Sequence, residues 1–161
     1  METIKQRFAE HITLAQQVAE SRILEQVAES AEIIRRALQN GKKVLFCGNG
    51  GSAADSQHLA AEFVGRFQKE RNGLPAIALT VDTSILTAVA NDYGYDTVFA
   101  RQVQALGNTG DVLVGLSTSG NSKNVLAAID VAKAKGIQFI GMTAQGGGKM
   151  AEVCDICMAV P

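Results

Sequence analysis

The sequence lacks a long apolar run, an excess of charge of either sign and a rich supply of cysteine. No stretch of its 161 residues approaches the roughly 20 apolar residues that span a membrane. Fifteen Lys and Arg residues face sixteen Asp and Glu residues, which argues against a basic nucleic-acid surface or an acidic disordered tail. The N-terminal residues 1–7 carry mixed charges and do not form a secretory signal. We therefore expect one cytoplasmic globular domain with no membrane or nucleic-acid partner.

The three cysteines are Cys47, Cys154 and Cys157. An odd number without a secretory signal argues against a disulfide framework. The Cys154–Cys157 spacing allows a redox or zinc pair, but no second pair and no helix start accompany it. We interpret all three as structural thiols.

What the sequence does have is an alternation of short apolar runs with helical patterns. The spacing of apolar residues predicts helices over 2–20, 23–39, 52–67, 84–91, 97–106, 122–135 and 148–153. Strands are predicted over 44–47, 75–80, 111–116, 138–143 and 155–160. This alternation is typical of an α/β fold with a parallel sheet that helices cover on both faces.

Two amphipathic helices precede the first strand, and Gly41 ends the second of them. The first places Ile4, Phe8 and Ile12 at helical spacing. Such a leading pair can pack against a partner subunit or can cover the sheet of its own chain, and the sequence leaves both possibilities open.

Two loops that lead from a strand into a helix are rich in glycine and hydroxyl residues. In parallel α/β folds, ligands bind at the carboxyl ends of the strands, where these loops lie. The first loop, residues 47–54, has three glycines that allow close backbone approach, and we expect Ser52 to cap the helix behind it. The second, residues 116–122, has four hydroxyl residues that can donate to a phosphate: Ser117, Thr118, Ser119 and Ser122.

The first loop also fits the G-x-G-x-x-A pattern of dinucleotide-binding folds. That interpretation needs an acidic residue after the next strand, and only Asp82 lies near that position. It also gives no ligand-binding role to the second loop, so we favour a phosphorylated sugar as the ligand.

His58 and Glu62 stand four residues apart on the helix that follows the first loop. Most pairs of this kind are surface interactions. Beside a ligand loop, however, the pair can bind one metal ion, or the carboxylate can act as a base.

Taken together, these segments resemble the phosphoheptose isomerases, a family with the SIS (sugar isomerase) fold. The resemblance extends over the whole chain and rests on residues 47–58, Glu62, Gly65–Arg66, residues 90–94 and residues 117–122. It implies a three-layer αβα sandwich with a five-stranded parallel sheet, preceded by two N-terminal helices. Residues 1–161 would form a single SIS domain, with helices in 1–40 at an oligomer interface and the sheet core in 41–161. The family enzyme is a homotetramer with active sites at subunit boundaries.

The resemblance also implies an activity, which is the isomerisation of sedoheptulose 7-phosphate to D-glycero-D-manno-heptose 7-phosphate for bacterial lipopolysaccharide. Glu62 matches the catalytic base, and His58 and Glu62 match ligands of one zinc ion per subunit. The matching substrate-binding residues are Asn49, Gly50, Gly51, Ser52, Glu62, Asn91, Asp92, Ser117, Thr118, Ser119 and Ser122.

The chemistry suits these residues, because moving a carbonyl between C2 and C1 needs a base and a means to steady the enediolate oxyanion. With the phosphate held by the loops, we expect the far end of the sugar to lie over Glu62. In the family a further helix follows and supplies more metal ligands. This sequence has only two histidines and stops at Pro161, so we expect residues beyond Pro161 to complete the zinc site.

A relative of the same fold binds the bacterial replication initiator protein instead, and residues 74–79 and 88–92 resemble it as well. Glu62 and Ser119 favour the enzyme, because that relative has a non-acidic residue and an arginine at the matching positions. A sugar-phosphate sensor without turnover is a third possibility.

Overall fold

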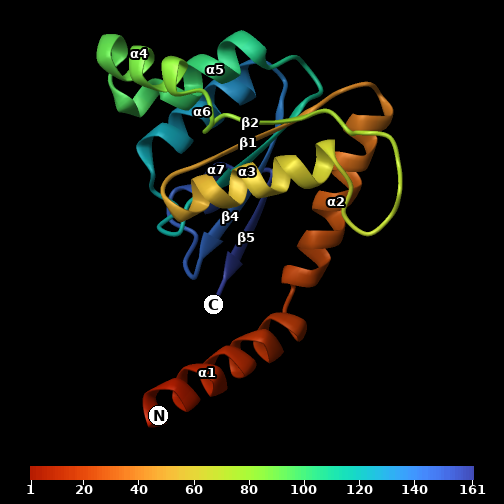
Figure 1. Cartoon of the computed structure of the whole chain (residues 1–161), viewed down its shortest axis with the longest axis vertical. Helices are drawn as coiled ribbons and strands as arrows, with labels where there is room; N and C mark the ends of the chain where they lie inside the picture. Colours follow the sequence, from red (N-terminus) through yellow and green to blue (C-terminus); the bar gives the residue numbers. More distant parts are fainter.

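The computed structural model describes all residues 1–161 and has a five-stranded parallel sheet at its centre (Figure 1). The strands are β1 (Val44–Gly48), β2 (Ala76–Ala78), β3 (Val112–Leu116), β4 (Gln138–Ala144) and β5 (Ile156–Val160). Their order across the sheet is β2-β1-β3-β4-β5, and every neighbouring pair is parallel. The predicted α/β sandwich with two leading helices is thereby confirmed.

The helices are α1 (Glu2–Ala19), α2 (Ile23–Gln39), α3 (Gly51–Val64), α4 (Thr83–Tyr93), α5 (Val98–Leu106), α6 (Lys123–Ala134) and α7 (Met150–Val153), with a short 3₁₀ helix η1 (Tyr95–Thr97). The predicted helices and strands are all present. The largest difference is at α3, which ends at Val64 rather than at residue 67. Beyond it, Arg71 donates to the carbonyl oxygens of Glu62 and Phe63 and so stabilises the end of the helix.

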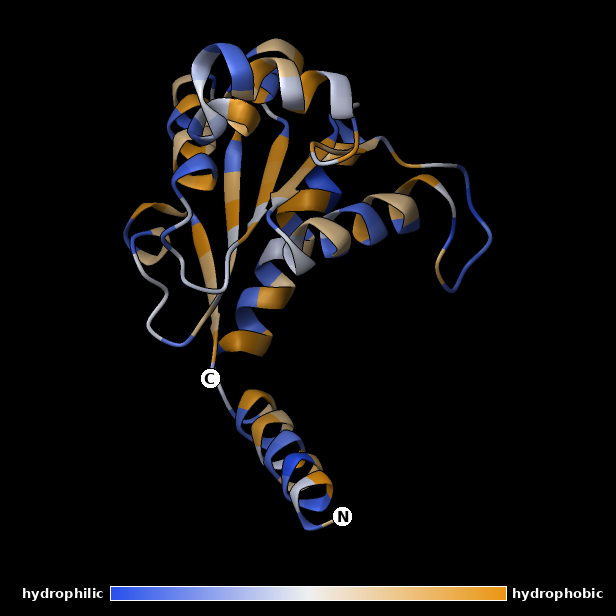
Figure 2. Ribbon diagram, turned by 60° about the vertical axis from the view of Figure 1, so that its left-hand side comes forward, coloured by the Kyte–Doolittle hydropathy of each residue, from blue (hydrophilic) through white to orange (hydrophobic).

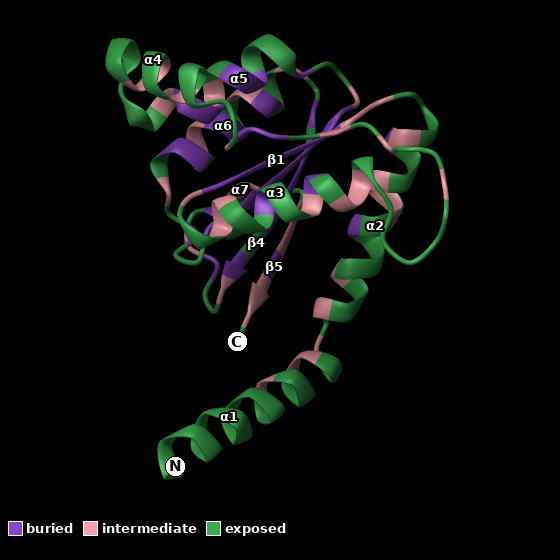
Figure 3. Cartoon of the chain, viewed as in Figure 1, coloured by how far each residue is buried: buried purple, intermediate pink, exposed green.

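Alternate residues of each strand point to opposite faces of the sheet, and two hydrophobic clusters result. Leu45 and Cys47 of β1 face a cluster that includes residues of α5, α6 and α7, whereas Val44 and Phe46 face residues of α2 and α3. Both clusters contain fully buried side chains, so helices cover the sheet on both faces. In Figure 3, β1 and β4 are mostly purple, whereas the edge strand β5 is mostly pink.

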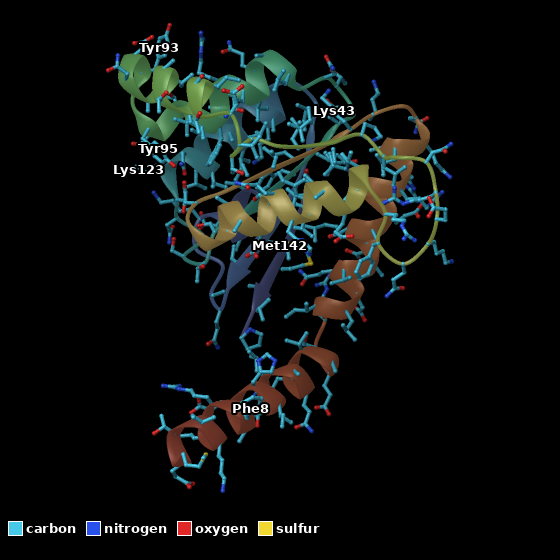
Figure 4. The ribbon with its side chains drawn as sticks, in the orientation of Figure 1. Phe8, Lys43, Tyr93, Tyr95, Lys123 and Met142 are labelled. Atoms are coloured by element: carbon cyan, nitrogen blue, oxygen red, sulfur yellow. The ribbon has the colours of Figure 1, made fainter.

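A buried ion pair joins the starts of β1 and β3, at the end of the sheet away from the loops discussed below. Lys43 Nζ lies 2.6 Å from Asp111 Oδ2, and the backbone N–H groups of Lys43 and Asn108 donate to the same carboxylate. Burial alone would raise the pKa of Asp111, but these hydrogen bonds and the Lys43 charge outweigh it and hold the pKa below its usual range. Figure 4 labels Lys43 at this end of the molecule.

The two leading helices behave differently. α2 packs on the sheet, where Ile33, Ile34 and Leu38 join the cluster of Val44 and Phe46. α1 has no buried residue and extends away from the rest of the chain, with apolar residues among polar ones (Figures 1 and 2). The alternative that α1 covers its own sheet is therefore wrong.

No helix of the structure combines the length and the apolarity that a membrane crossing requires.

Candidate functional site

The strand order places a ligand crevice between β1 and β3. The chain leaves β1 toward one side of the sheet and β3 toward the other, so the loops after these strands diverge. These are the two loops that the sequence singled out. The structure therefore brings Asn49–Gly51 and Ser117–Ser122 to one end of the sheet, on neighbouring strands.

The first loop turns tightly because its glycines permit it. Gly50 has a φ of 57° and a ψ of −122°, which side chains rarely allow, and it is the N-cap of α3. At Gly48, a Cβ would lie 2.7 Å from the Ser52 carbonyl oxygen, so only glycine lets the helix begin this close to the strand. The predicted capping role of Ser52 is wrong, because Ser52 lies inside the first turn and caps nothing with its hydroxyl.

Gly50 and Gly51 keep their backbone N–H groups free of hydrogen bonds within the chain. Free N–H groups at the start of a helix form a site of positive potential that suits an anion. The 14 residues of α3 make this a full helix rather than a single turn.

The second loop gathers hydroxyl groups at the end of β3. Ser117 is buried, and its Oγ lies 2.8 Å from Ser122 Oγ, while Thr118 and Ser119 are exposed. Ser122 is the N-cap of α6 but makes no capping hydrogen bond with its side chain, so its hydroxyl belongs to the loop.

A third loop, after β4, braces the second one, and the sequence interpretation missed it. Its residues 146–148 are three glycines with positive φ. The backbone N–H of Met150 donates to the Gly120 carbonyl oxygen at 3.0 Å, and that of Lys149 donates to Asn121 Oδ1 at 3.1 Å. The run of three glycines, which begins three residues after the end of the predicted strand 138–143, was the signal that could have revealed this loop.

A cavity of about 290 Å³ opens at the carboxyl ends of the strands, against the first turn of α3 and the first residues of the second loop. Ser52, Ser117 and Thr118 line it together with residues at the ends of β4 and β5, and none of its lining residues is charged. Met142 of β4, labelled in Figure 4, lies on its wall. The cavity therefore offers hydroxyl and backbone donors rather than lysine or arginine.

His58 and Glu62 lie on one face of α3, as predicted, with Nε2 and Oε1 3.8 Å apart. The His58 side chain is 72% exposed and that of Glu62 31% exposed. They line a second cavity of about 440 Å³, with Phe63, Phe67 and Arg71 among its other residues. No third His, Cys, Asp or Glu joins them to form a metal-binding group within residues 1–161.

Within one chain the structure does not bring Glu62 to the cavity at the carboxyl ends of the strands. Ser52 lies at the start of α3 and Glu62 near its end, ten residues or about 15 Å farther along the helix axis. The two cavities share no lining residue. The expectation that the far end of the sugar lies over Glu62 therefore has no counterpart inside a single chain.

Asn91 and Asp92 are exposed at the end of α4, where Asn91 Nδ2 donates to Asp92 Oδ1 at 2.9 Å. Neither bonds to the two loops. The chain that follows does reach the first loop, because the Tyr95 hydroxyl lies 3.4 Å from Asn49 Oδ1.

The other residues weighed from the sequence have structural roles. Asp82 is the N-cap of α4, and its carboxylate accepts the N–H of Ile85 at 2.9 Å, which explains its place after β2. Burial raises the pKa of the Cys47 thiol to about 12. Burial and the neighbouring Cys157 also raise the pKa of Cys154. All three cysteines are free thiols.

Comparison with known proteins agrees with the geometry. The SIS domain family matches residues 7–144. The phosphoheptose isomerase of Rhodospirillum rubrum is 64% identical over 135 residues, which cover 84% of this chain and 72% of that protein. That of Burkholderia pseudomallei is 57% identical over 148 residues, covering 92% of this chain and 75% of the relative.

Two solved structures match over almost the whole chain. Phosphoheptose isomerase GmhA of Neisseria gonorrhoeae superposes with a TM-score of 0.93 at 47% identity, and the enzyme of Francisella tularensis with 0.95 at 38%. Each match covers 99% of this chain and 85% of the other. These relatives are isomerases, and nothing in the matches supports the initiator-binding adaptor or the sensor. The chain therefore belongs to the SIS domain family and, within it, to the phosphoheptose isomerases.

Proposed function

We propose that this chain isomerises sedoheptulose 7-phosphate to D-glycero-D-manno-heptose 7-phosphate, a step toward the heptose of bacterial lipopolysaccharide. The observation that carries the proposal is the hydroxyl-lined cavity at the carboxyl ends of the strands, beside the start of α3, in a chain of this family. We place the reaction in the cytoplasm.

The phosphate would bind between the two loops. The free N–H groups of Gly50 and Gly51 and the positive end of α3 would face its oxygens from one side. Thr118 and Ser119 would donate from the other side. In the Ser117–Ser122 pair one hydroxyl donates to the other, so one proton of the pair is left to donate to the phosphate. Donors fixed by the backbone hold a phosphate without the long flexible side chains of lysine or arginine, so the sugar is held in a defined orientation.

The isomerisation moves a carbonyl from C2 to C1 by way of an enediolate. A carboxylate at Glu62 would take a proton from C1, and the C1–H electron pair would form the C1–C2 double bond while the C2 carbonyl oxygen becomes the enediolate oxygen. O2 would then gain a proton as O1 loses its own, the C1 carbonyl would form, and the proton held by Glu62 would return to C2. Glu62 is less exposed than His58 and lies in a largely apolar cavity, where a carboxylate can meet a sugar with little competing water. Asn91 and Asp92 would contact sugar hydroxyls.

We propose that His58 and Glu62 also contribute to a zinc site, one per subunit. Ligand atoms about 2.0 to 2.2 Å from a tetrahedral zinc ion stand roughly 3.3 to 3.6 Å apart, close to the 3.8 Å between His58 Nε2 and Glu62 Oε1. The donor types also fit, so the pair suits two of the positions around the ion. When bound, zinc supplies Lewis-acid polarisation of a sugar oxygen.

We further propose that the active site is assembled from more than one copy of the chain, in a homotetramer. The separation of the two cavities supports this, because a second copy could bring its own α3, with Glu62, to the cavity at the carboxyl ends of the strands. The unpartnered apolar side of α1 offers a surface for the assembly: Ile4, Phe8 and Ile12 are 58%, 68% and 57% exposed. Figure 4 shows Phe8 on the isolated helix.

Mixing two inactive variants tests this arrangement. Ser119→Glu places a negative charge in the phosphate loop, and Glu62→Gln removes the base. If each site takes its loops from one copy and Glu62 from another, mixed oligomers contain some sites with neither change. Statistical mixing then restores at most about one quarter of the parent activity in a paired, symmetric interface.

The matched control is Asp130→Asn, which removes an exposed carboxylate on α6 and should leave turnover unchanged. A mixture of Ser119→Glu and Glu62→Gln that stays inactive, although the copies exchange, would contradict the shared site. Full activity of Glu62→Gln alone would contradict the assignment of Glu62 as the catalytic base.

A further inference from the structure

Two asparagine side chains join the loops across the crevice. Asn49 Nδ2 donates to Asn124 Oδ1 at 2.9 Å, and Asn124 Nδ2 donates back to Asn49 Oδ1 at 2.9 Å. The two residues are 75 positions apart in the sequence. Asn49 belongs to the loop after β1, and Asn124 is the second residue of α6, directly behind the hydroxyl loop.

The Asn124 side chain is committed to this pair. The residue is 3% exposed, and its amide forms no other hydrogen bond in the chain. A buried amide without a partner would be costly, so the two side chains hold each other in one orientation. The Tyr95 hydroxyl, 3.4 Å away, occupies the remaining side of Asn49 Oδ1.

This pairing restricts what Asn49 can do. Its amide oxygen is taken up by Asn124 and Tyr95, and its amide nitrogen has one proton left. The loop therefore meets a ligand mainly through its backbone, whose position depends on where Asn124 holds Asn49.

If Asn124 only stabilised the fold, a nearby backbone group could serve as the hydrogen-bond partner of its buried amide. Here the partner is a side chain of the other ligand loop, and the bond crosses between β1 and β3 where the crevice lies. The geometry points to Asn124 as a positioning residue, which fixes the glycine loop relative to the hydroxyl loop. This inference rests on the proposed isomerase site and adds a residue to it.

The consequence for the reaction is a defined distance between the two sets of phosphate donors, which are the N–H groups of the glycine loop and the hydroxyls of the second loop. A shift of about 1 Å in such a group can cost about 100-fold in rate. We expect Asn124→Leu to lower kcat for sedoheptulose 7-phosphate by about that factor, because the loop loses its tether. Binding of inorganic phosphate should weaken by a smaller factor than kcat, because the glycine loop moves but the hydroxyls of the second loop remain in place.

Asn124→Asp gives a sharper test, since a protonated carboxyl group has the shape of the amide and can both donate and accept. An ionised carboxylate can only accept, and it would face the oxygen of Asn49. Burial favours the neutral form. The activity of Asn124→Asp relative to the parent should therefore rise as the pH falls.

Ionisable groups on η1 and α6 lie beside this pair, namely Tyr95 and the Lys123–Asp96 pair at 3.7 Å. Figure 4 labels Tyr95 and Lys123 close together at this end of the molecule. The parent has the same three groups, so the ratio of the two activities isolates the change at residue 124. Asn72→Asp, on an exposed loop, is the matched control and should show a flat ratio.

A measurement without substrate separates this inference from the proposed function. In protein labelled with ¹⁵N-asparagine, Asn124→Leu should shift the side-chain NMR signals of Asn49 and leave those of Asn72 in place. If the protein is no heptose isomerase, this shift and the phosphate titration still test the pair. Unchanged Asn49 signals, or a flat activity ratio for Asn124→Asp, would overturn the positioning role. If Asn124→Leu fails to fold, the pH dependence of the activity ratio between Asn124→Asp and the parent tests the positioning role by itself.

Discussion

Replacing Gly120 by alanine should both destabilise the protein and weaken phosphate binding. Gly120 lies in the hydroxyl loop with a φ of 63°, and an added Cβ would lie 1.9 Å from the Gly147 carbonyl oxygen and 2.5 Å from its carbonyl carbon. These are backbone atoms of the bracing loop, so no side chain can rotate away. The third loop would have to move by more than 1 Å to reach ordinary contact distance.

The magnitude follows from two costs. A left-handed backbone conformation costs an alanine about 1 kcal/mol. Overpacking against a rigid neighbour costs roughly a further 1 to 3 kcal/mol. The total is about 3 kcal/mol, a large share of the roughly 5 to 15 kcal/mol that stabilise a typical domain. Gly41→Ala isolates the first cost, because Gly41 has a φ of 69° and nothing within 4 Å of an added Cβ.

Urea unfolding followed by far-UV circular dichroism measures both variants, since the chain has no tryptophan. With a slope of about 2 kcal/mol/M, the midpoint should fall by about 0.5 M for Gly41→Ala and about 1.5 M for Gly120→Ala. Gly120→Ala should also bind inorganic phosphate more weakly, and Gly41→Ala should not. Equal midpoints for the two variants would refute the claim that the Gly147 backbone leaves no room for a side chain at Gly120.

Three further predictions concern groups outside that contact. Asp111→Asn should cost about 3 kcal/mol at pH 7, because Lys43 loses its buried partner. Since the pKa of Asp111 lies below its usual range, the stabilisation is present above about pH 4 and is lost as the pH falls through the lowered pKa. An equal loss in urea unfolding at pH 7 and pH 3 would contradict this. Burial raises the pKa of Cys47 to about 12, so iodoacetamide at pH 8 should modify Cys47 only after unfolding, as peptide mass spectrometry can check. His58→Ala should reduce the zinc bound per chain in elemental analysis, whereas His11→Ala on α1 should not, and equal zinc contents would remove His58 from the ligands.

Much of the fold could be predicted from periodicity alone. The buried strands are short apolar runs, and the helices between them have clear 3.6-residue patterns. The end of α3 was misplaced, because Phe67 continues the apolar pattern beyond the helix. Arg71, which holds that end, acts through backbone carbonyls that leave no signature in the sequence.

The sequence predicted the two loops of the candidate site but not the contacts that join them. Glycine and hydroxyl residues after a strand predict a ligand loop, and both loops lie where expected. Ser52 was mistaken for a cap, because the choice between Gly50 and Ser52 depends on a backbone angle and not on residue type. The pairing of Asn49 with Asn124 joins residues far apart in the sequence, so no local pattern could reveal it.

The most direct test of the account is proton exchange in D₂O. The parent and Glu62→Gln proteins would be incubated with sedoheptulose 7-phosphate and followed by NMR. The account predicts that the parent forms the aldose with deuterium at C2, while Glu62→Gln, with its fold intact, forms neither aldose nor deuterated sugar. Deuterium incorporation by Glu62→Gln at the parent rate, or none by the folded parent, would contradict it.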